Sequence, residues 1–270
     1  MRKKEIPLVG GFMIFDTHAH YCSSSYDEDR NALLESMNIN NIKYITEICA
    51  DMRSVDDVIS LARKYDFMTC TLGVHPSEVA ELTEDDMQLI KSKCMDASNK
   101  VVAIGEIGLD YHFDDDPAPE LQKKWFIRQL EIAKELHLPI VIHSRDAAKE
   151  TYDILKEYGG APYGGVIHCY SYSAEMARDF VDMNFYIGIG GVVTFKNAKK
   201  LKEVVEAIPL EKIVLETDCP YMAPTPHRGT RNSSLYLPLV VDEIAAIKGI
   251  SKDKIEEITT ENALNMYNIK

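Results

Sequence analysis

The sequence lacks the features that would assign it to a membrane or secreted class. No window approaches the roughly 18 consecutive apolar residues that a membrane-spanning helix needs. The basic N-terminus is not followed by the long apolar stretch and cleavage site of a signal peptide. The six cysteines are widely scattered and form no Cys-x-x-Cys pair, which argues against a zinc ribbon and a disulfide framework. The sequence therefore predicts a cytoplasmic protein with reduced thiols.

Positive charge is also scarce. Thirty Lys and Arg stand against 43 Asp and Glu in the 270 residues, a formal net charge of −13. An acidic surface repels a phosphate backbone, which disfavours sequence-blind binding to duplex DNA. A polyanionic substrate would need local cations, either bound metals or a few well-placed arginines. The sequence shows no recognition helix, no stacking platform and no sign of a membrane partner or an obligate protein partner.

Short apolar segments alternate with longer amphipathic segments along the whole chain. Apolar runs of this kind are typical of a parallel sheet covered by helices. Eight such units in about 250 residues fit a closed (β/α)8 TIM barrel better than an open doubly wound sheet. We therefore predict one α/β barrel domain over residues 13–270, with residues 1–12 as an N-terminal extension or a remnant of cloning. The predicted strands are residues 13–18, 44–49, 68–74, 101–106, 139–143, 165–168, 186–190 and 213–217, and the predicted helices are residues 54–65, 83–98, 120–136, 147–158, 174–183 and 199–207.

Two of the predicted helices begin with sequences that resemble N-terminal caps. Thr83 is followed three residues later by Asp86, and Ser54 is followed by Asp57. A hydroxyl that bonds the third backbone N–H of a helix, with an acid at that position, is a known capping arrangement. We expect Thr83 and Ser54 to cap these helices.

Metal-ligand residues end five of the eight predicted strands. His18 and His20 lie two residues apart, so their side chains share one face of an extended chain. The C-terminal end of barrel strands is where catalytic groups collect. Histidine and carboxylate ligands together suit one or two divalent ions. The residues predicted to converge are His18, His20, Glu106, His143, His168 and Asp218.

Each of these residues alone has a simpler explanation. A lone His after an apolar strand is more often hydrogen-bonded to the backbone, and a strand-end carboxylate often caps the next helix. Their coincidence on five strands favours a shared site. His137, at a helix-to-strand turn on the opposite rim, is assigned a structural role. His112 lies on the catalytic rim beyond its strand and is a candidate substrate contact only.

Seven segments, in order from residue 13 to the C-terminus, resemble the TatD family of metal-dependent deoxyribonucleases within the amidohydrolase-like barrel superfamily. The resemblance implies that His18, His20 and Asp218 hold one metal, that His143 and His168 hold a second, and that Glu106 bridges them. Thr230 stands where the family pattern leads us to expect Lys, and Ser233-Ser234 where we expect Glu-Pro. The matching segments are Phe15–His20, Gly73–Pro76, Gly105–Tyr111, His143–Arg145, His168–Tyr170, Glu216–Asp218 and Arg228–Asn232.

The predicted reaction is hydrolysis of phosphodiester bonds in single-stranded DNA or short oligonucleotides. A hydroxide activated by two divalent ions (Zn, Mn, Mg, Fe or Co) would attack phosphorus in line. Asp218 is either the group that orients this water or takes its proton, or a plain ligand. The candidate phosphate contacts are His75, Arg145, Arg228 and Arg231, with a turn residue as the alternative for His75 and surface ion pairs as the alternative for the arginines.

Two other functions remain open. The same ligand pattern serves enzymes that cleave a small amide, lactone or ester, and fold does not fix substrate. Relatives of that kind often bridge their metals with a carboxylated Lys, whereas this chain offers Glu106, which favours a phosphodiesterase. A non-catalytic binding protein would be expected to have lost ligands, and this sequence keeps all six.

Overall fold

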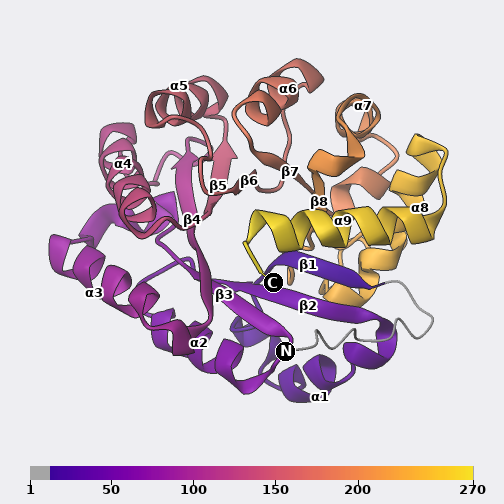
Figure 1. The fold of residues 1–270 in the computed structure, drawn as a ribbon, viewed down its shortest axis with the longest axis horizontal. Coiled ribbons are helices and arrows are strands. Elements are labelled where there is room, and N and C mark those ends of the chain that lie inside the picture. The colour runs from indigo at the N-terminus through magenta and orange to yellow at the C-terminus, as the bar shows by residue number, and fades with distance from the viewer. Residues whose placement is uncertain (1–12, 270) are drawn as a thin grey trace, which may run out of the picture.

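The computed structural model describes residues 13–269, so the predicted N-terminal extension, residues 1–12, lies outside the described residues. The chain alternates strands and helices (Figure 1). The strands are β1 (Ile14–Ala19), β2 (Ile42–Ile48), β3 (Met68–Leu72), β4 (Val101–Asp110), β5 (Ile140–Arg145), β6 (Gly165–Ile167), β7 (Tyr186–Ile189) and β8 (Ile213–Leu215). The α-helices are α1 (Arg30–Glu35), α2 (Val55–Lys64), α3 (Glu84–Met95), α4 (Pro119–Leu136), α5 (Ala148–Tyr158), α6 (Ala174–Asp182), α7 (Lys199–Ala207), α8 (Leu237–Lys248) and α9 (Lys252–Met266).

The eight strands form one parallel sheet in sequence order, and α2 to α8 lie around its outside (Figure 1). β1 is buried at all six of its positions, as expected for a strand covered on both faces. β1 and β8 meet through an isolated bridge between Ala19 and Cys219. Asp218 N–H donates to the His18 carbonyl at 2.9 Å, and His20 N–H donates to the Cys219 carbonyl at 2.9 Å. These bonds place the end of β1 beside the segment after β8, and they confirm the predicted single-domain (β/α)8 barrel.

Helix α9 closes the end of the barrel where the strands begin. It lies across the ring of strands in Figure 1. Ala263, Met266 and Tyr267 pack against side chains from the barrel interior, Phe15, Ala103, Val141, Val166 and Val214. The buried Asn262 amide donates to the carbonyls of Leu210 and Ile213 at 2.8 and 2.7 Å, at the start of β8. One end of the barrel is therefore filled by a helix, which leaves the other end for a site.

The predicted strands are confirmed in number and order, and β4 shows the largest difference in bounds. It continues to Asp110, four residues beyond the predicted end at Glu106. Its register with β5 shifts between Ile104 and Ile107, so Glu106 sits at an irregularity within the strand. The continuation needs Gly108, because a Cβ atom there would lie 1.9 Å from the His143 carbonyl oxygen.

The apolar pattern does not predict three helices, α1, α8 and α9, although the family resemblance includes a closing helix at Asn262-Ala263, within α9. α1 has only six residues. α8 is apolar along much of its length, and α9 buries Thr259, Thr260 and Asn262, so neither presents a plain apolar stripe. The capping box of Thr83 and Asp86 is confirmed. The expected Ser54 cap is wrong: Ser54 makes no side-chain cap bond, and the Asp51 carboxylate instead accepts from the Ser54 N–H at 3.0 Å.

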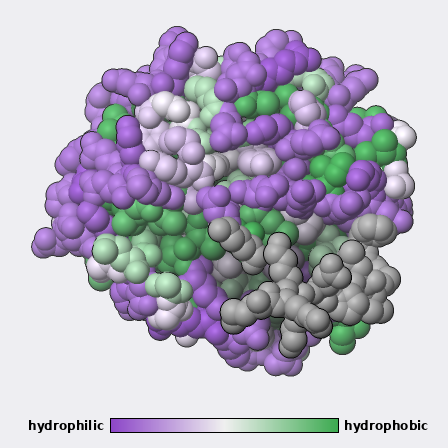
Figure 2. Space-filling model, in the orientation of Figure 1, coloured by the Kyte–Doolittle hydropathy of each residue, from purple (hydrophilic) through white to green (hydrophobic). Residues whose placement is uncertain are grey.

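No helix among residues 13–269 is both long and apolar enough to cross a membrane. On the face drawn in Figure 2, hydrophilic residues predominate and hydrophobic residues occur in smaller groups between them.

Candidate active site

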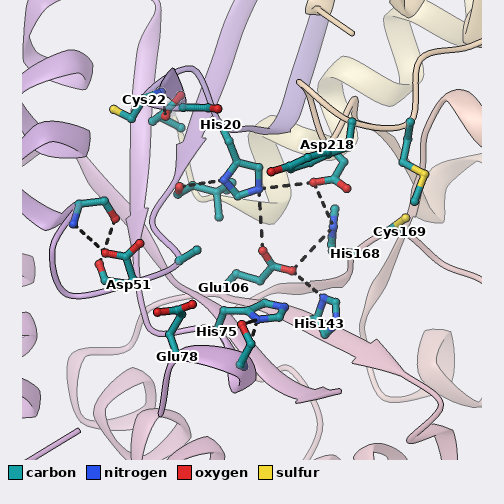
Figure 3. A pocket seen from close by; sticks show the side chains of 18 of the residues that line it. His20, Cys22, Asp51, His75, Glu78, Glu106, His143, His168, Cys169 and Asp218 are labelled. Atoms are coloured by element: carbon teal, nitrogen blue, oxygen red, sulfur yellow. Dashed lines mark hydrogen bonds and ion pairs between the residues drawn. The ribbon is translucent and has the colours of Figure 1, made fainter. Parts of the chain in front are cut away.

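The six predicted ligand residues lie together at the C-terminal ends of the strands. Figure 3 shows the five of them that it labels, all but His18, with their side chains pointing toward one another. Glu106 and His143 project from within β4 and β5, His168 follows β6, and Asp218 follows β8. Three triads have ligand atoms within 4.8 Å of one another, and each suits one metal ion: His18 with His168 and Asp218, His18 with His20 and Glu106, and His75 with Glu106 and His143.

Glu106 lies at the centre of the cluster, and its two oxygens face different histidines. Oε2 lies 3.3 Å from His18 Nε2 and 4.0 Å from His20 Nε2. Oε1 lies 2.9 Å from His143 Nδ1 and 3.8 Å from His168 Nε2. A carboxylate shared in this way between two pairs of imidazoles has the geometry of a bridging ligand.

Asp218 lies on the open side of the cluster. Its Oδ1 is 3.4 Å from His20 Nε2 and 3.8 Å from both His18 Nε2 and His168 Nε2. Both carboxylates line the cavity, and Asp218 is the more open of the two, with a side chain 19% exposed against 5% for Glu106. Its backbone has φ 55°, which turns the chain sharply after β8. Burial by itself raises the pKa of Asp218, but the hydrogen bond from His20 and the charge of His168 outweigh burial and lower it.

Hydrogen bonds behind the histidines orient three of the four rings. His143 Nε2 lies 3.0 Å from Asp110 Oδ2, His168 Nδ1 lies 3.0 Å from Glu216 Oε2, and His20 Nδ1 lies 3.2 Å from the Ile48 carbonyl. An acceptor at one ring nitrogen holds the proton there, so the other nitrogen turns its lone pair to the centre. This arrangement is typical of metal-binding histidines.

The charges at the centre favour a bound cation. Burial lowers the pKa of His168, but Glu216 and Glu106 outweigh burial and raise it to about 10. Burial also lowers the pKa of His143, and hydrogen bonds to Asp110 and Glu106 raise it to about 9. Raised pKa values mean that the carboxylates stabilise added positive charge here. A divalent ion supplies that charge and displaces the protons, so the residues present fit a metal site.

His18 is the most enclosed of the four histidines. Its ring stacks on that of His168, with centroids 3.4 Å apart. Its Nδ1 is buried without a hydrogen-bond partner among the described residues, whereas Nε2 faces Glu106 and Asp218. Burial and the neighbouring His168 lower the pKa of His18. A neutral ring with Nε2 facing two carboxylates is suited to ligation through that nitrogen.

Four buried carboxylates that support the site were not assigned roles from the sequence. Asp110 and Glu216 hold the rings of His143 and His168. Asp16 accepts from Thr217 Oγ1 and Ser234 Oγ at 2.7 and 2.6 Å and so ties β1 to the segments after β8. Glu47 accepts from the N–H groups of Tyr21 and Cys22 at 2.9 and 2.7 Å, which fixes the chain after His20. Glu216 has a sequence signal, since it precedes Asp218 by two residues just as His18 precedes His20.

His75 lies at the edge of the cluster, with its ring centroid 4.2 Å from that of His143. Its Nδ1 accepts a hydrogen bond from the Ser77 N–H at 3.2 Å. Burial and the charge of His143 lower its pKa to about 4, so the ring is neutral at pH 7 and carries its proton on Nε2. The ring is thus a neutral donor. The bond to Ser77 also caps the 3-10 helix that begins at Pro76, which agrees with the alternative role of His75 as a turn residue.

The three candidate arginines differ in placement. Arg145 lines the catalytic cavity and stacks on Phe113, with Cζ 5.1 Å from the ring centroid. Arg228 is not among the residues that line this cavity, and its guanidinium lies 4.5 Å over the Phe195 ring. Arg231 binds Asp29 with two nitrogens at 2.8 and 2.6 Å, the ion pair that the sequence left as its alternative. Arg145 is therefore the best placed of the three to reach a phosphate at the metal site.

The other histidines and the cysteines have supporting roles. His137 ends α4 with φ 56°, away from the cluster, as the structural assignment expects. His112 Nδ1 pairs with Asp146 at 2.7 Å. Burial raises the pKa of Cys219 to about 12 and that of Cys169 well above its usual range, so both thiols are protonated. Neither sulfur belongs to the groups of ligand atoms at the centre of the site.

The cluster forms the floor of an open cavity of about 610 Å³. Its wall includes residues in the C-terminal halves of, or just after, seven strands, all but β7, and its rim carries the exposed Tyr221 and Met222. A cavity of this volume accepts a ligand of nucleotide or drug size. A (β/α)8 barrel with four histidines and two shared carboxylates in such a cavity defines the class of metal-dependent hydrolases.

Comparisons with known proteins place the chain within this class. Residues 15–268 match the family described as TatD related DNase, and the chain belongs to this family. It is 44% identical to the uncharacterized metal-dependent hydrolase YabD of Bacillus subtilis over 95% of this chain and 100% of YabD. It is 31% identical to the uncharacterized metal-dependent hydrolase YcfH of Escherichia coli, over 95% of this chain and 96% of YcfH.

A solved structure agrees with this placement. The crystal structure of YjjV, a TatD homologue from Escherichia coli, superposes with a TM-score of 0.89 at 29% identity, over 95% of this chain and 98% of YjjV. The family membership, the barrel and the predicted class, a hydrolase acting on ester bonds, are confirmed.

Proposed function

We propose that the protein is a deoxyribonuclease that hydrolyses phosphodiester bonds of single-stranded DNA or short oligonucleotides at a centre of two divalent ions, in the cytoplasm. The observation that carries the two-ion proposal is the position of Glu106. One of its oxygens faces His18 and His20, and the other faces His143 and His168. A pair of imidazoles on each side of one carboxylate supports two ion positions bridged by Glu106.

The distances support the remaining ligand roles that the family resemblance implies. His18, His20 and Asp218 would complete one ion position, and His143 and His168 would complete the other. Bound divalent ions would lower the pKa of a water molecule and neutralise charge that develops on the phosphoryl group. The ligand set suits Zn, Mn, Fe or Co, and four imidazoles are unusual for a site that holds Mg alone.

The chain's own residues would position the water and the phosphate. The ionised carboxylate of Asp218 reaches the cavity and can accept a hydrogen bond from the attacking water, which orients it. His75 presents its Nε2–H toward the cluster and can donate to a non-bridging phosphate oxygen without adding a charge. Arg145 lines the same cavity and can form a charge-assisted bond with a flanking phosphate. Arg228, outside the cavity, is proposed to contact a more distant phosphate, and Arg231 would do so only if it released Asp29.

The test is cleavage by metal-stripped protein with ions added back singly. Single-stranded DNA is incubated with wild type, Glu106→Ala and, as a matched control, Glu243→Ala, whose carboxylate pairs with Lys202 on the outer layer. We expect nucleotide release by wild type and Glu243→Ala when an ion is restored, and loss of at least about 100-fold in Glu106→Ala because the bridging ligand is gone. If the protein binds two ions yet cleaves no DNA, RNA or simple phosphodiester, the nuclease proposal is wrong and a small amide or ester substrate takes its place.

A further inference from the structure

A second, smaller cavity lies beside the metal cluster on the side of β7 and β8. It has a volume of about 210 Å³, and nearly all of its lining surface is apolar. It shares Cys169, Ser171, Asp218 and Met222 with the catalytic cavity, so the two cavities adjoin across these residues. Its remaining lining residues are Tyr170, Gly188, Gly190, Gly191, Val192, Leu201, Glu216 and Thr217.

Glycines at the end of β7 pack closely against the segment after β8 and so fix the wall of this cavity. A Cβ atom on Gly188 would lie 2.3 Å from the Glu216 carboxylate, and one on Gly191 would lie 2.2 Å from the Met222 carbonyl oxygen. Neither position accepts a side chain without movement of its neighbours. The cavity therefore belongs to the built frame of the site.

Exposed hydrophobic side chains lie where the two cavities adjoin: Met222 lines both cavities, and Tyr221 lines the catalytic cavity. Tyr221 is 62% exposed and Met222 46% exposed, in the loop after β8. Met222 has φ 55°, a backbone conformation that a non-glycine residue adopts only rarely. Exposed apolar residues beside a catalytic cavity are typical of a ligand contact. Close by in the chain, Arg228 over Phe195 supplies a cation on the same loop.

We propose that this cavity is a base-binding subsite, which receives the nucleobase next to the scissile phosphate. The proposal rests on the proposed nuclease function. The cavity is smaller than the roughly 300–1,000 Å³ of pockets that bury drug-sized ligands, so it suits one ring system rather than a whole nucleotide. Val192, Leu201 and Met222 contact the faces of the ring, and Tyr221 stacks at the rim.

The chemistry of the lining determines which substrates the subsite accepts. Apolar walls contact the π-face that every base has, so binding does not depend on base identity. A base enters only when it is unpaired and unstacked from its neighbours, because a base inside a duplex cannot reach a side cavity. The subsite thus selects single strands, and the acidic surface of the protein disfavours duplexes independently.

The test fills the cavity. Val192→Phe places a ring in it, and Tyr221→Ala removes the exposed rim contact and offers a second variant with little risk to folding. Tyr163→Ala, an aromatic residue that contacts His137 on the opposite rim, is the matched control. Three substrates are compared: a single-stranded oligonucleotide, the same oligonucleotide with an abasic nucleotide next to the cleaved bond, and methyl p-nitrophenyl phosphate, which has no base.

We expect Val192→Phe to raise KM for the oligonucleotide by roughly 10-fold or more, the range expected when the stacking of one base is lost. The KM for methyl p-nitrophenyl phosphate, which has no base, should change much less. For the abasic substrate, the KM of wild type should already be raised by the same factor, and Val192→Phe should not raise it further. Equal effects on all three substrates, or full activity of wild type on the abasic substrate, would overturn the subsite.

Binding separates this proposal from the proposed function. The Kd of a dinucleotide that contains 2-aminopurine is measured by its fluorescence, which requires no turnover. A Kd raised by Val192→Phe and Tyr221→Ala but not by Tyr163→Ala supports the subsite even where no diester is cleaved, and in that case only the nuclease proposal fails. A Kd that neither variant changes overturns the subsite, whatever the catalytic assay shows.

Discussion

Glu216 offers a test of how the carboxylates behind the histidines control metal binding. Its Oε2 accepts from His168 Nδ1 at 3.0 Å, and its Oε1 accepts from the Cys169 N–H at 2.6 Å. Glu216→Gln keeps the side-chain volume but leaves only one acceptor oxygen for two donors. If that oxygen stays on Cys169, the new NH2 group faces His168 Nδ1. The ring must then accept at Nδ1 and carry its proton on Nε2, the nitrogen that faces Glu106 and Asp218.

The expected loss follows from the bond that is removed. A hydrogen bond to a charged group contributes about 1.5–3 kcal/mol. Since about 1.4 kcal/mol corresponds to a tenfold change in an equilibrium constant, metal affinity should fall about 10- to 100-fold. The same range is typical when a group that orients a metal-bound histidine is replaced. One ion position should weaken more than the other, because Glu216 contacts only His168 among the four histidines.

The assay is a titration of metal-stripped protein with Zn or Mn in competition with a chelator, followed by calorimetry. Glu243→Gln, on the outer layer, is the matched control. Thermal unfolding of the metal-free proteins is measured alongside, to separate a general loss of stability from a loss of metal affinity. If a folded Glu216→Gln protein binds both ions with affinities within about twofold of wild type, then this carboxylate does not set the orientation of the His168 ring.

Two further predictions test the fold and the phosphate contacts. Asn262→Ala leaves the buried carbonyls of Leu210 and Ile213 without their donor. At about 1–3 kcal/mol per group, we expect the free energy of unfolding to fall by about 2–6 kcal/mol in urea denaturation. Arg145→Ala should raise KM for an oligonucleotide more than Arg231→Ala does, because Arg145 lines the cavity whereas Arg231 is held by Asp29. Equal KM values for the two variants would contradict this placement.

The barrel could be predicted because its signal is repeated eight times. Each strand is a short apolar run, and one uncertain boundary does not change the order of the others. The helices that the apolar pattern does not predict carry no such signal. α9 packs against the barrel with Thr259, Thr260 and Asn262 facing inward, and a polar buried face cannot be distinguished in sequence from an exposed one. The role of α9 in closing the barrel depends on tertiary contacts with Phe15 and Val214, which are far from it in the chain.

The convergence of the site could be predicted for residues that end a strand, because parallel strands of a barrel bring those ends together. Strand positions alone do not predict the pairing within the cluster, which only the family resemblance implied. The division of the Glu106 oxygens between two pairs of histidines depends on the irregular register of β4 with β5. The ion pair of Arg231 with Asp29 likewise joins residues about 200 positions apart, and no local pattern indicates it.

The acidic composition has a different meaning in the interior than on the surface. Glu47, Glu106, Asp110 and Glu216 are buried around the histidines, where they hold rings and loops and stabilise positive charge. Carboxylates on the surface repel a polyanion. The buried carboxylates, in contrast, favour bound cations at the centre of the cavity. A nucleic acid substrate is then attracted mainly at the metal centre and by Arg145 rather than along an extended basic surface. Under the proposed function, the enzyme would engage a short unpaired segment at its cavity, and the proposed apolar subsite beside Asp218 would add a base contact that the acidic surface cannot supply.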